Sequence, residues 1–188
     1  MKYKAIIFDF FGVISSNTAP NWFENHFPNT DNKKLKEKYF IPADAGQMTE
    51  EELLENLATI SKTTPKEVSE EIQSYAVINK ELIQFILELK KEYKIGICTN
   101  AVSGFFRRIL KDNDIENLFD VIIVSSEIGI SKPNPEIYLK TLESLGTIPS
   151  ETIMIDDTLE NITAANEIGI KGLLFVSNEK LKEDFANL

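Results

Sequence analysis

The stretch AIIFDFFGVI, residues 5–14, is the part of the sequence that decides the fold. Its first four residues are all apolar, and Asp9 follows them directly. A short, uninterrupted apolar run is typical of a strand that is buried on both faces of a parallel sheet. Similar runs follow at residues 95–98, 121–124, 152–155 and 172–175. The sequence therefore predicts five buried strands, the first of which ends in a carboxylate.

Amphipathic segments separate the later apolar runs. Residues 101–112, 135–145 and 158–168 carry apolar side chains at helical spacing. The middle segment is framed by Asn134-Pro135, a cap with Pro in the first turn, and by Gly146, a glycine typical of a helix end. Strands that alternate with helices are typical of α/β folds. We expect a doubly wound, Rossmann-like parallel sheet.

Residues 15–80 differ from the rest, because they contain no clear strand pattern. Helices are indicated at residues 31–40, 49–61 and 65–76. The second helix begins with the capping box Thr49-x-x-Glu52. We expect residues 15–80 to form an α-helical cap inserted into an α/β core of residues 1–14 and 81–188. Periodicity alone also allows a long helical excursion over one face of the sheet.

The charge balance limits the partners of this 188-residue chain. It carries 20 Lys and Arg against 30 Asp and Glu, a net charge of −10. Nucleic-acid affinity depends on cations that replace counterions, so no nucleic acid is expected. No apolar stretch reaches the ~20 residues that span a bilayer, and the N-terminus lacks a signal-peptide pattern. We expect a cytoplasmic protein without a membrane partner, present as a monomer or weak homodimer.

Polar side chains stand where the predicted strands end. They are Asp9, Thr99 and Asn100, Asp156 and Asp157, and Lys132 in the loop before residues 135–145. Each of these features alone is common in turns and helix caps. In an open α/β sheet, however, the carboxyl ends of the strands share one edge, and ligands bind there. Their joint order along the chain therefore indicates a single site.

Three carboxylates at one edge repel each other strongly unless a cation lies between them or one is protonated. Oxygen ligands of this kind suit Mg²⁺, which is usually held by a few carboxylates together with a substrate phosphate. Lys132 adds a compact positive charge, and the start of the helix after Asn100 offers backbone N–H groups to an anion. We expect a Mg²⁺ cofactor and a phosphorylated substrate.

These residues resemble the motifs of the haloacid dehalogenase (HAD) superfamily of hydrolases, in the same order along the chain. The matching segments are Asp9-Phe10-Phe11-Gly12-Val13-Ile14, Thr99-Asn100, Lys132-Pro133 and Asp156-Asp157-x-x-x-Asn161. The resemblance covers the whole chain and is greatest to the sugar-phosphatase-like branch, which has a helical cap between the first two motifs. It implies a Rossmann-like core and a phosphatase activity.

The resemblance also implies roles for individual residues. Asp9 would attack phosphorus and form an aspartyl-phosphate, which water then hydrolyses. The metal ligands would be Asp9, the backbone carbonyl of Phe11, Asp156 and Asp157. The resemblance does not indicate which of Asp156 and Asp157 binds the metal directly.

Substrate contacts follow from the same resemblance. Thr99 would hydrogen-bond the transferring phosphoryl group, with Asn100 beside it, and Lys132 would offset the negative charge. Asn161 would orient Lys132 or a metal-bound water.

Phe11 is the one departure from the phosphatase pattern. Most phosphatases of the superfamily carry a second Asp at this position, which protonates the leaving group and later activates water. General acid–base help is worth ~10²–10⁴-fold, or about 3–5 kcal/mol, so we expect slow turnover. Two alternatives stay open: a pseudo-phosphatase that only binds its ligand, and a haloacid dehalogenase, which needs neither metal nor leaving-group acid.

The substrate depends on the cap. Trp22, Phe23 and His26 are candidates for the entrance to the site, although aromatic residues at helical spacing more often pack a core. The turn at residues 45–48 is a candidate rim. We expect a small phosphorylated metabolite, with a sugar phosphate as the suggestion of the resemblance.

Overall fold

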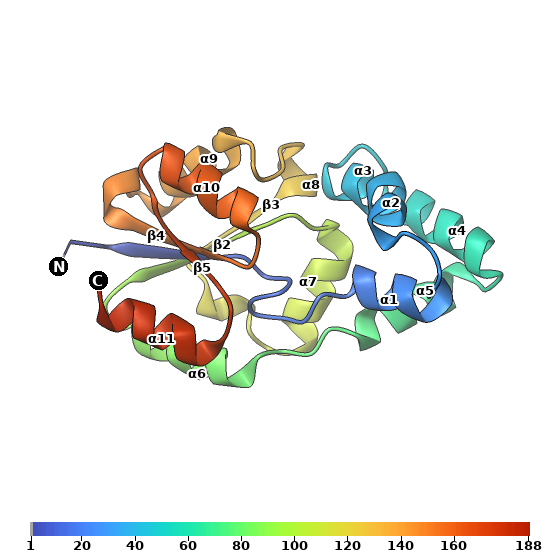
Figure 1. Cartoon of the computed structure of the whole chain (residues 1–188), viewed down its shortest axis with the longest axis horizontal. Coiled ribbons are helices and arrows are strands. Elements are labelled where there is room, and N and C mark those ends of the chain that lie inside the picture. The colour runs from blue at the N-terminus through green and yellow to red at the C-terminus, as the bar shows by residue number, and fades with distance from the viewer. Residues whose placement is uncertain (1) are drawn as a thin grey trace.

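The computed structural model describes residues 2–188 and contains one five-stranded parallel sheet (Figure 1). Its strands are β1 (Ala5–Phe8), β2 (Lys94–Thr99), β3 (Val121–Val124), β4 (Thr152–Asp156) and β5 (Lys171–Leu174). Their order across the sheet is β3-β2-β1-β4-β5, so β1 lies in the centre. Phe8 pairs with Ile97 on one side and with Ile155 on the other. The predicted doubly wound α/β fold is confirmed.

Alternate residues of β1 explain how both faces of the sheet are covered. Ile6 and Phe8 belong to one apolar cluster, whereas Ala5 and Ile7 belong to another on the opposite face. The first cluster includes side chains of α6 (Lys80–Leu89), α7 (Ser103–Asp112) and α11 (Asn178–Ala186). The second includes side chains of α9 (Pro135–Leu145) and α10 (Leu159–Glu167). Helices therefore cover both faces, as a buried parallel sheet requires.

Short helices complete this part of the chain. They are α8 (Ser125–Ile128) and the 3-10 helices η2 (Glu116–Leu118) and η3 (Pro149–Glu151). The five strands and helices α7, α9 and α10 lie within two residues of the predicted ranges, whereas α6, α11 and the three short helices lie outside them.

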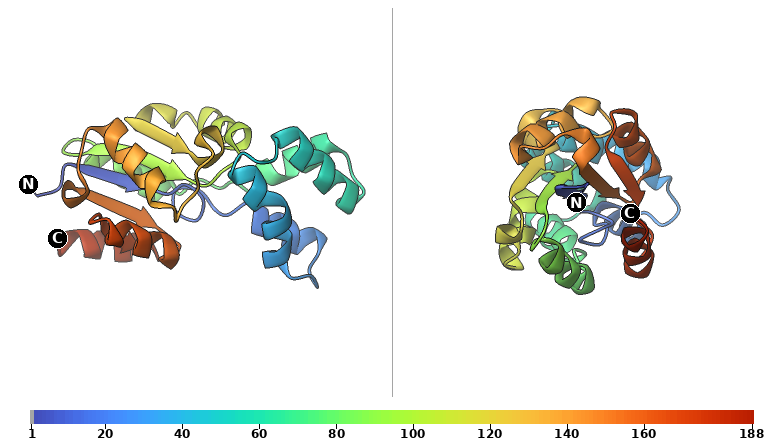
Figure 2. Two further views of the ribbon diagram at one scale, coloured as in Figure 1. Left: turned by 90° about the horizontal axis from the view of Figure 1, so that it is seen from above. Right: turned by 90° about the vertical axis from the view of Figure 1, so that its left-hand side faces the viewer.

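Every secondary-structure element between β1 and α6 is a helix. Its elements are α1 (Ala19–His26), α2 (Asn32–Leu35), the π-helix η1 (Lys36–Phe40), α3 (Ile41–Asp44), α4 (Glu50–Ser61) and α5 (Pro65–Ser74). The three predicted helices are confirmed, including the capping box of Thr49 and Glu52. Helices α1 and α3 lie outside the predicted ranges. Figure 2 shows these elements at the end of the molecule opposite both termini.

The inserted helices have an apolar cluster of their own. Trp22, Phe23, Leu53 and Leu57 are fully buried within it. The cluster also includes Phe105, which lies on α7 of the α/β part. The insertion therefore packs around its own side chains but also against one helix of the sheet layers. Its definition as a separate cap domain stays a prediction. Within residues 2–188, no helix combines the length and the apolar character needed to cross a bilayer.

Candidate active site

The carboxyl ends of β1, β2 and β4 meet at the edge of the sheet that faces the insertion (Figure 1). Asp9 follows β1, Thr99 ends β2 and Asp156 ends β4. All three residues are buried, at 8%, 0% and 0% exposure. Because β1 pairs directly with both other strands, residues far apart in the sequence come together here.

Lys132 forms the charged centre of the site. Its Nζ lies 2.6 Å from Asp156 Oδ2 and 2.9 Å from Asp9 Oδ1, and the residue is 4% exposed. Asn100 holds the loop that carries it, because the Asn100 side chain accepts a hydrogen bond from Lys132 N at 2.8 Å and donates one to Lys132 O at 2.9 Å. The amide of Asn100 therefore positions Lys132.

Asp156 is saturated with hydrogen bonds. Besides the contact with Lys132, it accepts bonds from the backbone N–H of Thr158 at 2.8 Å and from Asn161 Nδ2 at 3.0 and 3.1 Å. Both of its oxygens are thus occupied by protein donors. Asn161 acts on Lys132 through Asp156, which it holds in place.

Asp157 is more exposed than Asp156 and makes one weak side-chain hydrogen bond, with Thr158 Oγ1 at 3.3 Å. One oxygen each of Asp9, Asp156 and Asp157 lies within 4.8 Å of the others. Asp9 Oδ1 is engaged by Phe10 N at 2.6 Å and by Lys132, which leaves Oδ2 for another partner. Such a set of hard oxygen donors fits a divalent cation such as Mg²⁺, and the oxygens of Asp157 are the ones least engaged by protein donors.

Gly12 allows Asp157 to approach the loop after β1. Its φ is +86°, and a Cβ at this position would lie 2.0 Å from Asp157 Oδ2. A side chain here would displace the carboxylate. The next residue back, Phe11, is half-buried, packs edge-on against Phe10 with ring centroids 5.1 Å apart, and lines the site.

A cavity of about 500 Å³ opens from these residues towards the insertion. Residues of the sheet edge that line it include Asp9, Ser131, Lys132, Asp157 and Asn161. Residues of the insertion that line it are Asn17, Pro20, Lys36, Ile41 and Asp44. A smaller cavity of about 60 Å³ shares several of these residues and adds apolar side chains such as Phe40, Ile72 and Phe105. The site thus lies between the sheet edge and the inserted helices.

Two hydroxyl groups at the site have no partner. Thr99 Oγ1 and Ser131 Oγ are buried atoms without a hydrogen bond to any described residue. A buried hydroxyl without a partner is costly, so each is suited to bind a polar ligand. Ser131 lines the large cavity, whereas Thr99 is fully buried at the end of β2 and lines neither cavity. Thr99 was among the predicted residues, whereas Ser131 was missed, although it directly precedes Lys132.

Burial and neighbouring charges set the protonation of the central pair. Burial raises the pKa of Asp9, the Lys132 ammonium opposes that rise, and the Asp156 carboxylate adds to it. Burial alone would lower the pKa of Lys132, but Asp9 and Asp156 outweigh this effect and hold it above its usual value. Lys132 therefore stays charged beside Asp9.

The predicted entrance residues lie elsewhere. Trp22 and Phe23 are buried in the cluster of the insertion, and His26 Nε2 lies 2.6 Å from Glu71. None of the three lines the two cavities described above. Gly46 of the predicted rim packs against α8, where an added Cβ would lie 2.7 Å from Ser126 O. In place of these residues, Lys36 and Asp44 reach the site, and no motif in the sequence indicated them.

Comparison with known proteins agrees with this fold. Residues 6–175 match the family described as haloacid dehalogenase-like hydrolase. The chain therefore belongs to this family of hydrolases, and the resemblance noted in the sequence is confirmed.

Three relatives illustrate the similarity. The phosphorylated carbohydrates phosphatase of Thermotoga maritima is 26% identical over 181 residues, which cover 89% of this chain and 82% of that protein. Pyrophosphatase PpaX of Bacillus mycoides is 32% identical over 125 residues, or 60% of this chain and 58% of that protein. The HAD family enzyme bt-2542 of Bacteroides thetaiotaomicron, in a complex with magnesium and inorganic phosphate, shares the fold with a TM-score of 0.82 and 23% identity. That match covers 97% of this chain and 99% of the other.

Proposed function

We propose that this hydrolase is a Mg²⁺-dependent phosphatase that acts on a small phosphorylated metabolite through an aspartyl-phosphate on Asp9. The observation that carries the proposal is the state of the Asp9 carboxylate. One oxygen is held by Lys132 at 2.9 Å and by Phe10 N, while Asp9 lines a cavity large enough for a metabolite. A carboxylate held in this way is positioned to attack with its other oxygen.

Residues around Asp9 would bind the phosphoryl group and offset its negative charge. Thr99 and Ser131 have hydroxyls free to donate to its oxygens, and Lys132 offsets the negative charge that Asp9 and the phosphoryl group share. Oδ2 of Asp9 forms a bond to phosphorus while the bond from phosphorus to the leaving oxygen breaks. Water then attacks the aspartyl-phosphate, which releases inorganic phosphate and restores the carboxylate.

The proposed ligands of Mg²⁺ are Asp157, the backbone carbonyl of Phe11, and Asp9 through Oδ1, the oxygen that does not attack phosphorus. Asp156 is not proposed as a metal ligand, because both of its oxygens already accept protein hydrogen bonds. When bound, the ion would supply positive charge that stabilises the phosphoryl oxygens. Asp156 and Asn161 keep Lys132 in place beside it.

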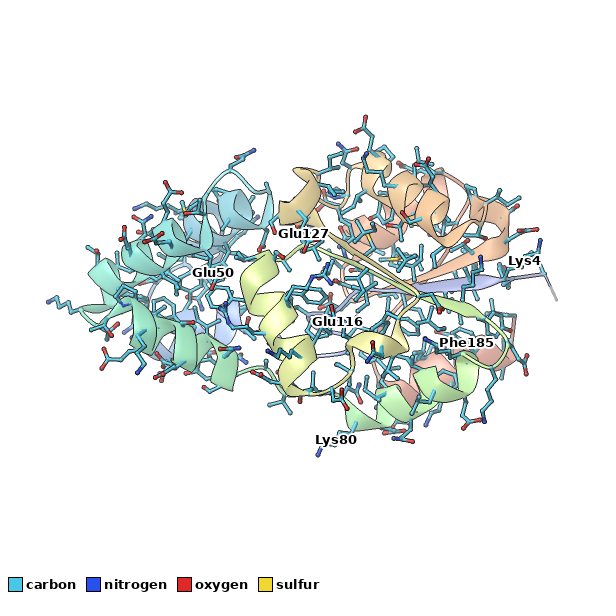
Figure 3. All side chains as sticks on the ribbon, turned by 180° about the vertical axis from the view of Figure 1, so that it is seen from behind. Lys4, Glu50, Lys80, Glu116, Glu127 and Phe185 are labelled. Carbon is cyan, nitrogen blue, oxygen red and sulfur yellow. The ribbon has the colours of Figure 1, made fainter. Side chains whose placement is uncertain are left out.

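The haloacid dehalogenase alternative lacks support at the cavity. The chain has only two arginines, Arg107 and Arg108, and neither lines it. Both lie on α7 and pair with Glu116, Glu127 and Glu50, which surround that helix in Figure 3. No guanidinium is therefore placed to hold a departing halide. A sugar phosphate stays a candidate substrate, supported by the similarity to the phosphorylated carbohydrates phosphatase of Thermotoga maritima.

The test is phosphate release from a panel of sugar phosphates, diphosphates and 4-nitrophenyl phosphate, with Mg²⁺ and with EDTA. We expect release that requires Mg²⁺ and that Asp9→Asn abolishes, because an amide is a poor nucleophile. Asp112→Asn, a change at an exposed residue of α7, is the matched control. Ligand binding without release would favour the pseudo-phosphatase, and halide release from a 2-haloacid without metal would favour the dehalogenase.

A further inference from the structure

Asp44 is a carboxylate of the insertion that reaches the site. It is the last residue of α3 and lines both the large cavity, together with Asp9 and Phe11, and the smaller one beside it. Figure 1 shows α3 next to α8, above the carboxyl ends of the strands. Asp44 therefore belongs to the wall that the insertion contributes, whereas Asp9 belongs to the wall that the sheet contributes.

Asp44 is fixed to the α/β part through its backbone. Its carbonyl oxygen accepts a hydrogen bond from Ser125 Oγ, and that hydroxyl accepts one from Ala101 N at 3.0 Å. Ser125 is fully buried. Two residues later, Gly46 has φ +71° and leaves no room for a side chain against Ser126 O. The carboxylate of Asp44 is thus held in a defined place relative to β2 and α8, although its helix belongs to the insertion.

The reaction needs a proton donor on that side of the cavity. In an in-line displacement the leaving oxygen lies opposite the attacking oxygen, away from Asp9 and towards the insertion. Phe11 has no proton to give. Lys36 is exposed, and Asp157 has the free oxygens proposed for the cation, so neither is suited to the task. Asp44 is the half-buried carboxyl group among the residues of the insertion that line the cavity.

We propose that Asp44 is the general acid and base of this enzyme, in place of the carboxylate that position 11 lacks. The inference rests on the proposed phosphatase function. The Asp44 carboxyl group donates its proton to the leaving oxygen as the bond between that oxygen and phosphorus breaks. The resulting carboxylate then takes a proton from the water that attacks the aspartyl-phosphate, which returns Asp44 to its acid form.

The surroundings of Asp44 agree with both halves of this cycle. The pKa of Asp44 is raised to about 7. Burial is the largest cause, Asp9 adds to the rise, and Lys36 of η1 and the backbone N–H of Val102 oppose it. Lys132 also lines the cavity and adds a positive charge, whereas Asp157 and Glu160 add negative charges. A group whose pKa lies near neutrality is present as both acid and base at the pH of the reaction, which suits a general acid and base.

The experiment compares two substrates in the intact chain with Mg²⁺. 4-Nitrophenyl phosphate has a leaving group that departs without a proton, whereas glycerol phosphate has an alkoxide that requires one. We expect Asp44→Asn to lower kcat/KM for glycerol phosphate by about 10²–10⁴-fold and to change that for 4-nitrophenyl phosphate only a few-fold. The same variant should lose the limb of the pH profile near pH 7 for the alkyl ester. Asp44→Glu, which keeps a carboxyl group, should retain part of the alkyl activity.

The aryl ester also reports on folding and on the proposed function. If Asp44→Asn lowers both activities equally, or neither, the assignment of Asp44 is overturned. If the wild type releases phosphate from neither ester, the proposed function fails first, and the inference falls with it. Asp112→Asn should leave both activities unchanged.

Discussion

The ammonium group of Lys132 lies 2.6 Å from a carboxylate oxygen of Asp156, and the two side chains are 1% and 0% exposed. A buried pair of this kind contributes little net stability compared with an apolar pair, but the loss of one partner leaves a buried charge without compensation. Asn161 and Thr158 N occupy the other positions on Asp156. Asp156 is therefore fixed in place, and it holds the Lys132 ammonium beside Asp9.

Asp156→Asn should destabilise the protein by up to about 3–5 kcal/mol, because it removes one of the two carboxylates that pair with a buried ammonium. Urea unfolding of the wild type and the variant measures the change. Lys132→Met should also destabilise, and the double variant should lose less than the sum of the two single losses, because both remove the same contact. Additive losses would contradict the coupling of Lys132 and Asp156.

Asp157→Asn should separate metal binding from stability. The side chain makes one weak hydrogen bond, so we expect little change in unfolding without metal. Mg²⁺ should stabilise the wild type by RT ln(1 + [L]/Kd), about 2.7 kcal/mol at 100 times Kd, and the variant much less. Thermal unfolding over a range of Mg²⁺ concentrations measures this. A full metal response in Asp157→Asn would move the ligand role to Asp156.

Gly12→Ala tests the close approach of the β1 loop to Asp157. The substitution places a Cβ where Asp157 Oδ2 now lies and strains a residue with φ +86°. We expect a loss of about 1–3 kcal/mol and weaker binding of Mg²⁺. Gly129→Ala is the matched control, since Gly129 has φ +68° but no atom within 4 Å of the added Cβ. Equal effects on Mg²⁺ binding in both variants would contradict the role of Gly12.

Asp44 should make the stability of the protein depend on pH. Its pKa rises from 3.8 to about 7 on folding, so the folded state binds more protons between these values. The contribution of Asp44 is therefore fully present below about pH 4 and is lost as the pH rises through 7. One pKa unit corresponds to about 1.4 kcal/mol, and partial exposure of Asp44 reduces the total to roughly 1–4 kcal/mol.

Asp44→Asn removes this titration. The unfolding free energy of the variant, relative to the wild type, should increase between pH 4 and pH 8. Denaturant unfolding at a series of pH values gives the two curves, with Asp112→Asn as the control that should follow the wild type. Parallel curves for Asp44→Asn and the wild type would show that Asp44 does not titrate in this range.

Phe11→Asp tests whether Asp44 has replaced the missing carboxylate. If it has, the substitution should bring only a small gain with alkyl phosphates in the wild type and a larger gain in the Asp44→Asn background. The gain is limited, because a carboxylate in place of a packed ring needs a hydrogen-bond partner and leaves a void. Stability must be measured with the rates. A large gain in the wild type would mean that position 11, and not Asp44, limits the reaction.

Much of the site was predictable because it follows from the order of the strands. Asp9, Thr99 and Asp156 each end a short apolar run, and parallel strands bring such ends to one edge. Lys132 was predictable from its place in the motif order. The sequence did not indicate helices α1 and α6. It also did not distinguish the roles of Asp156 and Asp157, because they are adjacent residues of the same type.

The sequence by itself determined the parallel sheet and the gathering of carboxylates at its edge, because apolar runs and their polar ends are local features that the topology carries to one place. The tertiary structure alone decided which carboxylate is saturated by Lys132, Thr158 N and Asn161 and which keeps free oxygens. It also decided that Asp44 lines the cavity. That placement depends on a hydrogen bond between Ser125 and Asp44, residues 81 positions apart, and no local pattern encodes a contact between elements so distant in the chain.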